Sequence, residues 1–390
     1  MSLNIDCAFD SGNIERLDSA VDGVVNLAIR KDASSDFLQW FHFRASGLKG
    51  QTCRFNIVNA GDTTYPQGWD GFDVVTSSDR HFWYRTPTQY DGKCLSWEVH
   101  QAETDALWFA YFAPYSTHQH TDLIAAAATA EGVEYRSLAS THLGRSIDYL
   151  RVTALRQETA NDPVNSARRQ LWVIARQHPG ESMAGWWMEG WLDRLLDHHD
   201  ATSCALRALV DIHIVPNMNP DGTFLGHLRT NALGVNLNRE WQDPSIEKSP
   251  EVFYVRQLME STGVDLALDV HGDEALPYNF IAGTEGVRGW NEQRNAELQG
   301  VKETWAAINP DFQTVHGYPK TSPGSANLSI CSNYLADRFG CLAMTLEMPF
   351  KDTADTPRVN SGWSPERSMR LGSSFVDVAY LALTKRLLGG

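Results

Sequence analysis

Residues 171–181 read LWVIARQHPGE, an apolar, strand-like run that leads directly into His178 and Glu181. Three later apolar runs also end in residues that can carry chemistry: DIHIVPNMN leads into an Asn-Pro-Asp-Gly turn, DLALDV into His271 and CLAMTL into Glu347. In an open parallel sheet, ligands bind outside the carboxyl ends of the strands. The pattern therefore predicts that these side chains gather at one edge of a sheet.

The composition is typical of a folded globular protein, because 42% of the 390 residues are hydrophobic and only 21% are charged. A chain of this length predicts roughly two or three domains. The net charge of −15 makes nucleic acid and anionic membrane surfaces poor partners. No run approaches the roughly 18 apolar residues of a membrane span, and the first residues lack the apolar segment of a secretory signal. We therefore expect a protein of the cytoplasm.

The six cysteines are scattered along the chain and form no Cys-x-x-Cys pair. This distribution is typical of reduced, mostly buried thiols in a cytosolic protein. The alternative interpretation is a set of three disulfides.

Two architectures follow one another along the chain. Residues 1–115 contain short runs that alternate apolar and polar residues, separated by turn residues, which predicts a β-sandwich. Residues 116–390 alternate apolar strand-like runs with helical patterns, which predicts an α/β fold with a mixed or parallel sheet and helices on both faces. We therefore expect an all-β sandwich domain at 1–115 and an α/β domain at 116–390.

His178 and Glu181 are separated by Pro-Gly, a tight turn that lets both side chains face one point. Imidazole nitrogen and carboxylate oxygen bind zinc, and a catalytic zinc site uses three protein ligands and keeps one position open. His271 is the best candidate for the third ligand, because it follows a second strand-like run. The alternative interpretation of the turn is a helix start with a surface histidine and an N-terminal glutamate.

A loop-rich segment between the two histidines contains Arg229, Asn238 and Arg239. The planar guanidinium fork suits a carboxylate or a developing oxyanion, although a single arginine more often forms a surface salt bridge. Glu347 directly follows an apolar run. It is either a general base beside an activated water or a buried carboxylate paired with a local cation such as Lys351.

The motifs HPGE, NPDG, LNREW, DVHGD and TLEMPF follow one another in this order. Together they resemble the zinc metallocarboxypeptidases of the M14 type, and among these the cytosolic carboxypeptidase branch in its bacterial form. FDSGNIE and FAPYS resemble the beginning and the end of the β-sandwich domain that precedes the enzyme domain in that branch. The resemblance covers nearly the whole chain and implies a carboxypeptidase that acts on the C-terminal tails of peptides or proteins.

The resemblance also implies a role for each candidate residue. One zinc ion per chain would be held by His178, Glu181 and His271. Glu347 would be the general base, and Arg229 would stabilise the oxyanion that forms when a metal-activated water attacks the last peptide carbonyl.

For the substrate, the resemblance implies that Asn238 and Arg239 hold the terminal α-carboxylate. The family has a tyrosine on a loop ahead of the general base, and both Tyr318 and Tyr334 fit by position. We assign Tyr318 as the substrate-binding tyrosine.

The released residue is expected to meet the segment that precedes Glu347. Family members that remove glutamate usually have an arginine there, whereas this segment has Arg338 outside the expected position, with Lys320 just before it. We therefore expect a preference that is different from, or broader than, glutamate alone.

Two other functions stay open from the sequence. A zinc amidohydrolase of small N-acyl amino acids would share the His-x-x-Glu and His pattern, but the β-sandwich and the full NPDG to LNREW segment argue against it. A non-catalytic peptide-binding module would have no use for Glu347 beside a complete set of metal ligands.

Overall fold

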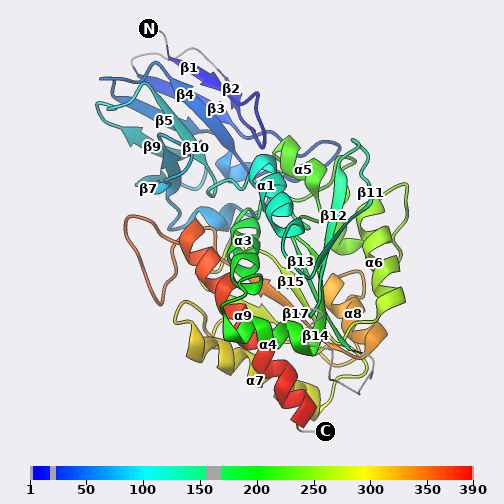
Figure 1. Ribbon diagram of the computed structural model, residues 1–390. Coiled ribbons are helices and arrows are strands. Elements are labelled where there is room, and N and C mark those ends of the chain that lie inside the picture. The colour runs from blue at the N-terminus through cyan, green and yellow to red at the C-terminus, as the bar shows by residue number, and fades with distance from the viewer. Residues whose placement is uncertain (1–2, 18–22, 155–167, 389–390) are drawn as a thin grey trace.

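The computed structural model describes residues 3–17, 23–154 and 168–388 (Figure 1). The first part of the chain is all-β. Its strands are β1 (Asn4–Asp6), β2 (Glu15–Arg16), β3 (Val24–Ala28), β4 (His42–Ser46), β5 (Cys53–Ile57), β6 (Val74–Ser77), β7 (Tyr84–Thr86), β8 (Thr88–Tyr90), β9 (Leu95–Val99) and β10 (Ala106–Ala110), with two 3₁₀ turns, η1 (Ala60–Asp62) and η2 (Pro66–Trp69).

These strands form two five-stranded sheets, in the orders β1-β4-β10-β6-β7 and β2-β3-β5-β9-β8. Aromatic rings from both sheets meet between them: the Phe109 ring of β10 lies 5.0 Å from the Phe55 ring of β5 and 5.5 Å from the Trp97 ring of β9. The two sheets therefore share one aromatic core between them, as in a sandwich. The predicted all-β sandwich is confirmed.

The rest of the chain alternates helices and strands. The helices are α1 (Thr117–Ala128), α3 (Met183–Leu195), α4 (Ala201–Leu209), α5 (Pro220–Leu225), α6 (Pro250–Thr262), α7 (Glu292–Ile308), α8 (Cys331–Phe339) and α9 (Pro365–Leu388), with a 3₁₀ turn, η3 (Leu237–Arg239). The strands are β11 (Val133–Ser140), β12 (Ser146–Val152), β13 (Arg169–Ala175), β14 (Val210–Val215), β15 (Leu266–Val270), β16 (Phe280–Ala282) and β17 (Leu342–Glu347).

These seven strands form one mixed sheet in the order β11-β12-β14-β13-β15-β17-β16. The four central strands β14, β13, β15 and β17 are parallel, and the strands at both edges are antiparallel to their neighbours. Helices α3, α4, α7 and α9 cover one face of the sheet, and α6 and α8 cover the other (Figure 1). The predicted mixed α/β fold with helices on both faces is confirmed.

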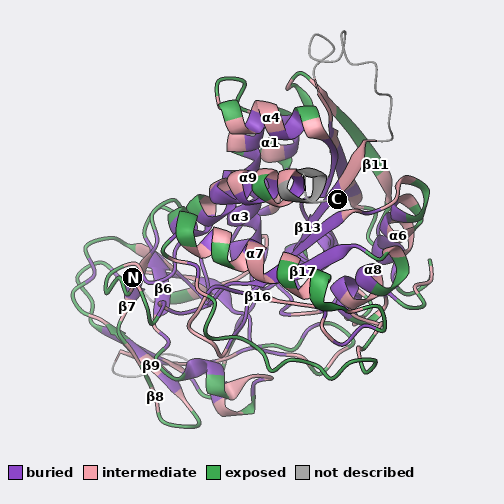
Figure 2. Ribbon diagram, turned by 90° about the horizontal axis from the view of Figure 1, so that it is seen from below, coloured by how far each residue is buried: buried purple, intermediate pink, exposed green. Residues whose placement is uncertain are grey.

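Strand β13 shows why the centre of this sheet is mostly apolar. Leu171 and Val173 belong to the core under α3 and α9, whereas Trp172 and Ile174 belong to the core under α6 and α8. All four side chains are buried, and Figure 2 shows β13 in the purple of buried residues. A strand covered on both faces is mostly apolar, and the proposed site residues lie at or just beyond the carboxyl ends of such strands.

Some elements were not predicted from the sequence. The hairpin of β11 and β12 is largely polar on its outer strand, since β11 lies at the sheet edge and most of its residues are exposed. Helix α8 begins without a side-chain cap and lies in a segment expected to be a loop. Both elements are held by tertiary packing, which local patterns do not report.

The all-β part and the α/β part share one hydrophobic core. The Tyr111 ring, just after β10, stacks on the Phe350 ring, just after β17, with centroids 4.3 Å apart. The buried guanidinium of Arg85 donates hydrogen bonds to the main-chain oxygens of Phe350 and Trp363, at 2.8 and 3.0 Å. The two parts are therefore joined directly behind the strand that carries Glu347.

Two further expectations concern cysteines and membranes. All six cysteines lie in the described residues and none forms a disulfide, and Cys53, Cys331 and Cys341 are buried. Among the described helices, none is both long and apolar enough to span a bilayer.

Candidate metal centre and active site

The residues at the carboxyl ends of the central parallel strands lie together at one edge of the sheet. Val270 of β15 pairs with Ala175 of β13 on one side and with Leu346 of β17 on the other. His271 follows Val270 and lies beside Glu347, which follows Leu346. His178 follows Ala175 after a short turn. The main chain strengthens this arrangement, because His271 N donates to Leu346 O at 2.8 Å.

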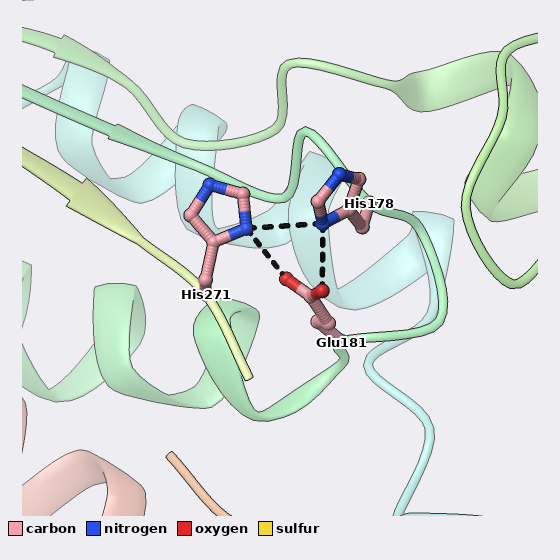
Figure 3. A group of neighbouring side chains, drawn as sticks. All are labelled: His178, Glu181 and His271. Carbon is pink, nitrogen blue, oxygen red and sulfur yellow. Dashed lines mark hydrogen bonds and ion pairs between the residues drawn. The ribbon is translucent and has the colours of Figure 1, made fainter. Parts of the chain in front are cut away.

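Three side chains converge at this edge (Figure 3). His178 Nδ1 lies 2.7 Å from Glu181 Oε1, His271 Nδ1 lies 2.8 Å from Glu181 Oε2, and the two Nδ1 atoms are 3.1 Å apart. Two ligand atoms that each lie about 2.1 Å from a tetrahedral zinc ion are about 3.4 Å apart. Within the described ranges these three residues are the one group of His, Cys, Asp and Glu with metal-binding spacing.

Both histidines are held with Nδ1 toward this point, because Nε2 has another partner. His271 Nε2 lies 2.9 Å from Asp269 Oδ2, and His178 Nε2 lies 3.1 Å from Asn236 Oδ1. An acceptor oxygen at Nε2 keeps the proton there and leaves the Nδ1 lone pair for a metal ion. The donor set and its orientation therefore fit zinc.

The electrostatics also favour a cation at this position. Burial lowers the pKa of His178 to about 3, which keeps its ring neutral. Burial alone would raise the pKa of Glu181 and lower that of His271. Instead, the two histidines hold the pKa of Glu181 below its usual range, and Asp269 and Glu181 hold the pKa of His271 well above it. The buried carboxylates attract positive charge to the point where the three side chains meet.

A cavity of about 540 Å³ opens beside the three residues. It is lined by all eight residues singled out from the sequence, which come from widely separated segments: His178, Glu181, Arg229, Asn238, Arg239, His271, Tyr318 and Glu347. The all-β part adds Tyr65 and Gln67 to its wall.

Glu347 presents its carboxyl group to this cavity. It is 8% exposed, and its Oε2 is buried without a hydrogen bond from any described residue. Burial raises the pKa of Glu347 well above its usual range. His271 lowers this pKa, whereas the nearby carboxylates of Glu181, Asp273 and Glu274 raise it further. The alternative partner Lys351 instead donates to the main-chain oxygen of Asp70 at 2.6 Å.

Arg229 lies half-buried on the cavity wall without an ion-pair partner among the described residues. Its guanidinium carbon lies 5.7 Å from the centroid of the Phe37 ring and 5.5 Å from that of Tyr65, both in the all-β part. Contact with ring faces orients a guanidinium and leaves its N–H groups free to donate.

Asn238 and Arg239 come from η3 and lie side by side at the cavity. Asn238 Oδ1 accepts from Cys331 N at 2.8 Å, which fixes the amide plane, and Arg239 Nη1 donates to Asn238 O at 2.6 Å. The Arg239 side chain is exposed, so one face of its fork can receive a carboxylate from solvent.

The structure separates the two candidate tyrosines. Tyr318 is 47% exposed, lines the cavity and donates from its hydroxyl to Asp273 Oδ2 at 2.5 Å. Tyr334 lies on α8, where its hydroxyl donates to Glu260 Oε1 at 2.9 Å, and it is not part of the cavity wall. The geometry therefore favours Tyr318.

The basic residues near the cavity differ from those expected. Arg338 forms an ion pair with Glu260 at 2.7 Å outside the cavity, whereas Lys320 lines it. The sequence reasoning missed Lys302 of α7, which lines the cavity together with Glu285 and has no ion pair among the described residues. Helix α7 is largely polar, so its sequence does not indicate that its lysine lies at this edge of the sheet.

Comparison with known proteins decides the family. Residues 122–357, more than half of the chain, match the family model described as zinc carboxypeptidase. The chain belongs to the zinc carboxypeptidase family. Residues 5–112 of this carboxypeptidase match a second model, described as the cytosolic carboxypeptidase N-terminal domain. Members of the family are zinc-dependent hydrolases that act on peptide bonds, and the resemblance inferred from the sequence motifs is confirmed.

Individual relatives cover nearly the whole carboxypeptidase chain. It is 46% identical to an uncharacterized protein of Zymomonas mobilis over 95% of this chain and 94% of that protein. It is 25% identical to cytosolic carboxypeptidase 6 of Caenorhabditis elegans over 93% of this chain and 82% of the relative.

Solved structures of bacterial metallo-carboxypeptidases have the same fold. The protein of Burkholderia cenocepacia is 39% identical with a TM-score of 0.93, covering 98% of this chain and 100% of that one. The protein of Pseudomonas aeruginosa, solved in complex with (2-guanidinoethylmercapto)succinic acid, is 42% identical with a TM-score of 0.92, covering 98% and 99%.

Proposed function

We propose that this protein is a zinc-dependent carboxypeptidase that hydrolyses the C-terminal peptide bond of peptide or protein substrates. The observation that carries the proposal is the single cavity of about 540 Å³. It brings a three-residue metal site together with a buried carboxyl group and two arginines from distant parts of the chain. The succinic acid derivative bound by the Pseudomonas aeruginosa relative supports a cavity that accepts carboxylates.

The metal ion would be held by His178, Glu181 and His271, whose ligand atoms already converge. When bound, zinc would polarise the carbonyl of the scissile bond and make a water molecule easier to deprotonate into a nucleophile.

The terminal carboxylate of the substrate would be held by Arg239 and Asn238. The arginine fork donates two parallel hydrogen bonds to a carboxylate, and the amide of Asn238 adds a donor whose direction is fixed by Cys331. The Tyr318 hydroxyl, now on Asp273, lies on the same cavity and can turn to the substrate. These contacts would place the last peptide bond, and no internal bond, beside the metal site.

Two residues would act on the reacting atoms. Glu347 takes a proton from the attacking water and delivers it to the nitrogen of the leaving amino acid, so that its carboxyl group ends the cycle as it began. Arg229 donates to the carbonyl oxygen as negative charge develops there. Its guanidinium has no competing ion pair among the described residues, so it is available when that charge appears.

We also propose that the chain divides into a β-sandwich domain, 1–115, and a catalytic domain, 116–390, and that it works in the cytoplasm. The two family matches, 5–112 and 122–357, support this division. The name of the cytosolic relative and the six cysteines without a disulfide support the location.

The test is zinc content together with cleavage of one peptide in free and C-terminally amidated form. We expect about one zinc ion per chain, release of the last residue from the free peptide and little cleavage of the amidated one. Arg239→Lys should raise KM for the free peptide, because a lysine does not reproduce the bidentate contact.

The alternatives give different results in the same assay. Equal cleavage of the free and amidated peptides would refute the carboxylate clamp. Turnover of N-acyl amino acids without peptide cleavage would identify an amidohydrolase. Peptide binding without turnover by the zinc-loaded protein would identify a non-catalytic module.

A further inference from the structure

Asp32, a residue of the all-β part, binds the loop that carries Arg229. Its Oδ1 accepts from Leu228 N at 2.6 Å, and its Oδ2 accepts from Arg229 N at 2.8 Å and from Thr230 N at 3.0 Å. Thr230 Oγ1 adds a fourth hydrogen bond to Oδ2 at 3.0 Å. One buried carboxylate therefore fixes three successive peptide N–H groups centred on Arg229.

The opposite side of this loop rests on the metal-binding turn. Leu228 O accepts from Gly180 N at 2.9 Å, and Gly180 lies between the proposed ligands His178 and Glu181. A Cβ atom at Gly180 would come within 2.9 Å of Leu228 O, so the two segments are in close contact. The Arg229 loop is thus held between Asp32 and the HPGE turn, and Leu228 contacts both.

The segment that begins at Asp32 also meets the side chain of Arg229. Asp32 N donates to Phe37 O at 2.8 Å, which closes a short loop. The Phe37 ring of this loop and the Tyr65 ring lie 5.7 and 5.5 Å from the guanidinium carbon. A second contact anchors the same loop, because Ala33 N donates to His227 Nε2 at 3.0 Å.

We propose that Asp32 is a positioning residue for Arg229, so that the all-β part is a component of the catalytic apparatus. Asp32 fixes the main chain of Arg229, and Phe37 and Tyr65 orient its guanidinium toward the developing oxyanion. The inference rests on the proposed function, which gives Arg229 its role in stabilising that charge.

The test is a double-mutant cycle on the zinc-loaded full-length chain, using Asp32→Asn and Arg229→Ala. Asparagine keeps the shape of Asp32 but replaces an accepting oxygen with an NH₂ group that faces peptide N–H groups. Displacing a catalytic group by about 1 Å costs about a hundredfold in rate, so we expect Asp32→Asn to lower kcat by about 10- to 100-fold. KM and zinc content should stay near their wild-type values, because the residues proposed to bind carboxylate and metal are untouched.

The decisive measurement is the effect of Asp32→Asn when Arg229 is already alanine. A residue that acts through Arg229 has nothing left to position, so kcat should then change by less than about twofold. If Asp32 merely joins the two parts of the chain, Asp32→Asn lowers kcat by the same factor in both backgrounds, and that result overturns the proposal.

Two further variants keep the test interpretable. Asp10 is a matched control, because its Oδ2 also accepts from a peptide N–H and a hydroxyl across the junction, those of Thr117, at 2.6 and 2.8 Å. Asp10→Asn should leave kcat unchanged. If Asp32→Asn does not fold, Thr230→Val removes only the hydroxyl contact to Asp32, and a loss of about threefold that disappears in the Arg229→Ala background carries the same conclusion.

Failure of this inference differs from failure of the proposed function. If Arg229→Ala leaves kcat unchanged, Arg229 has no catalytic role and the function proposed for it is wrong. If Arg229→Ala lowers kcat but neither Asp32→Asn nor Thr230→Val does, the role of Arg229 stands and the positioning role of Asp32 is refuted.

Discussion

Replacing Glu347 with glutamine separates proton transfer from every other property of the cavity. The two side chains have the same shape, and Glu347 Oε2 makes no hydrogen bond to a described residue that the amide would break. Glutamine has no proton-accepting carboxylate, so only the general base is removed. Zinc content should be unchanged, because Glu347 is not among the three converging ligand candidates.

The magnitude follows from the role. General base catalysis contributes about 10²- to 10⁴-fold, or about 2.7 to 5.4 kcal/mol at 1.36 kcal/mol per decade. We expect kcat to fall within this range while KM changes little, because the proposed carboxylate clamp of Asn238 and Arg239 is intact. The melting temperature should not fall, since the variant removes a carboxyl group whose charge Glu181, Asp273 and Glu274 disfavour.

A second buried carboxyl group in the same cavity provides the matched control. Burial raises the pKa of Glu274 to about 8, although the charge of Arg229 lowers it, and the Glu274 main chain lies close to Gly68 of the all-β part. Release of the last residue from a free-C-terminus peptide should be measured for Glu347→Gln and Glu274→Gln, with zinc content determined for both. Near-normal kcat in Glu347→Gln, or the larger loss in Glu274→Gln, would show that Glu347 is not the base.

The remaining predictions test the metal, the released side chain and stability. His178→Ala should lose nearly all zinc by elemental analysis while the exposed-histidine variant His100→Ala keeps it; full occupancy in the first would contradict the metal site. Lys302→Met should lower kcat/KM for a peptide ending in Glu about fivefold relative to one ending in Leu, as expected for a partly exposed ion pair of about 1 kcal/mol, and an unchanged ratio would exclude Lys302 from the specificity pocket. Burial raises the pKa of Glu251 to about 7, so wild-type stability falls as the pH rises from about 4.5 to about 7. In urea unfolding, Glu251→Gln should therefore gain about 2.5 kcal/mol relative to wild type between pH 5 and pH 8, and an equal stability difference between the two proteins at both pH values would contradict this.

The parts of the site that could be predicted from sequence are those fixed by the sheet. The central parallel strands are covered on both faces and are mostly apolar, so polar residues at or just after their carboxyl ends mark the sheet edge, as Glu347 and His271 do. Because β13, β15 and β17 are neighbours, these residues lie together whatever the loops do. The HPGE turn adds Glu181 to His178 by local geometry alone.

The parts that could not be predicted depend on how helices and loops pack. Tyr334 and Arg338 both lie on α8, which turns them toward Glu260 of α6 and away from the cavity. Lys302 comes to the cavity because α7 passes the sheet edge there. Asp32 reaches Arg229 across nearly 200 residues of sequence. No spacing rule connects such positions.

The place of β17 in the sheet has a consequence for biosynthesis. This strand is made after β15 and β16, yet it lies between them and carries Glu347. Until residues 342–347 have been made, β15 has an unpaired edge beside the proposed metal ligands, and the buried carboxyl group is absent. A chain that stops short of Leu342 would therefore present an apolar strand edge prone to aggregation. Under the proposed mechanism, peptidase activity requires this strand, so a chain that stops before it would be inactive as well as prone to aggregation.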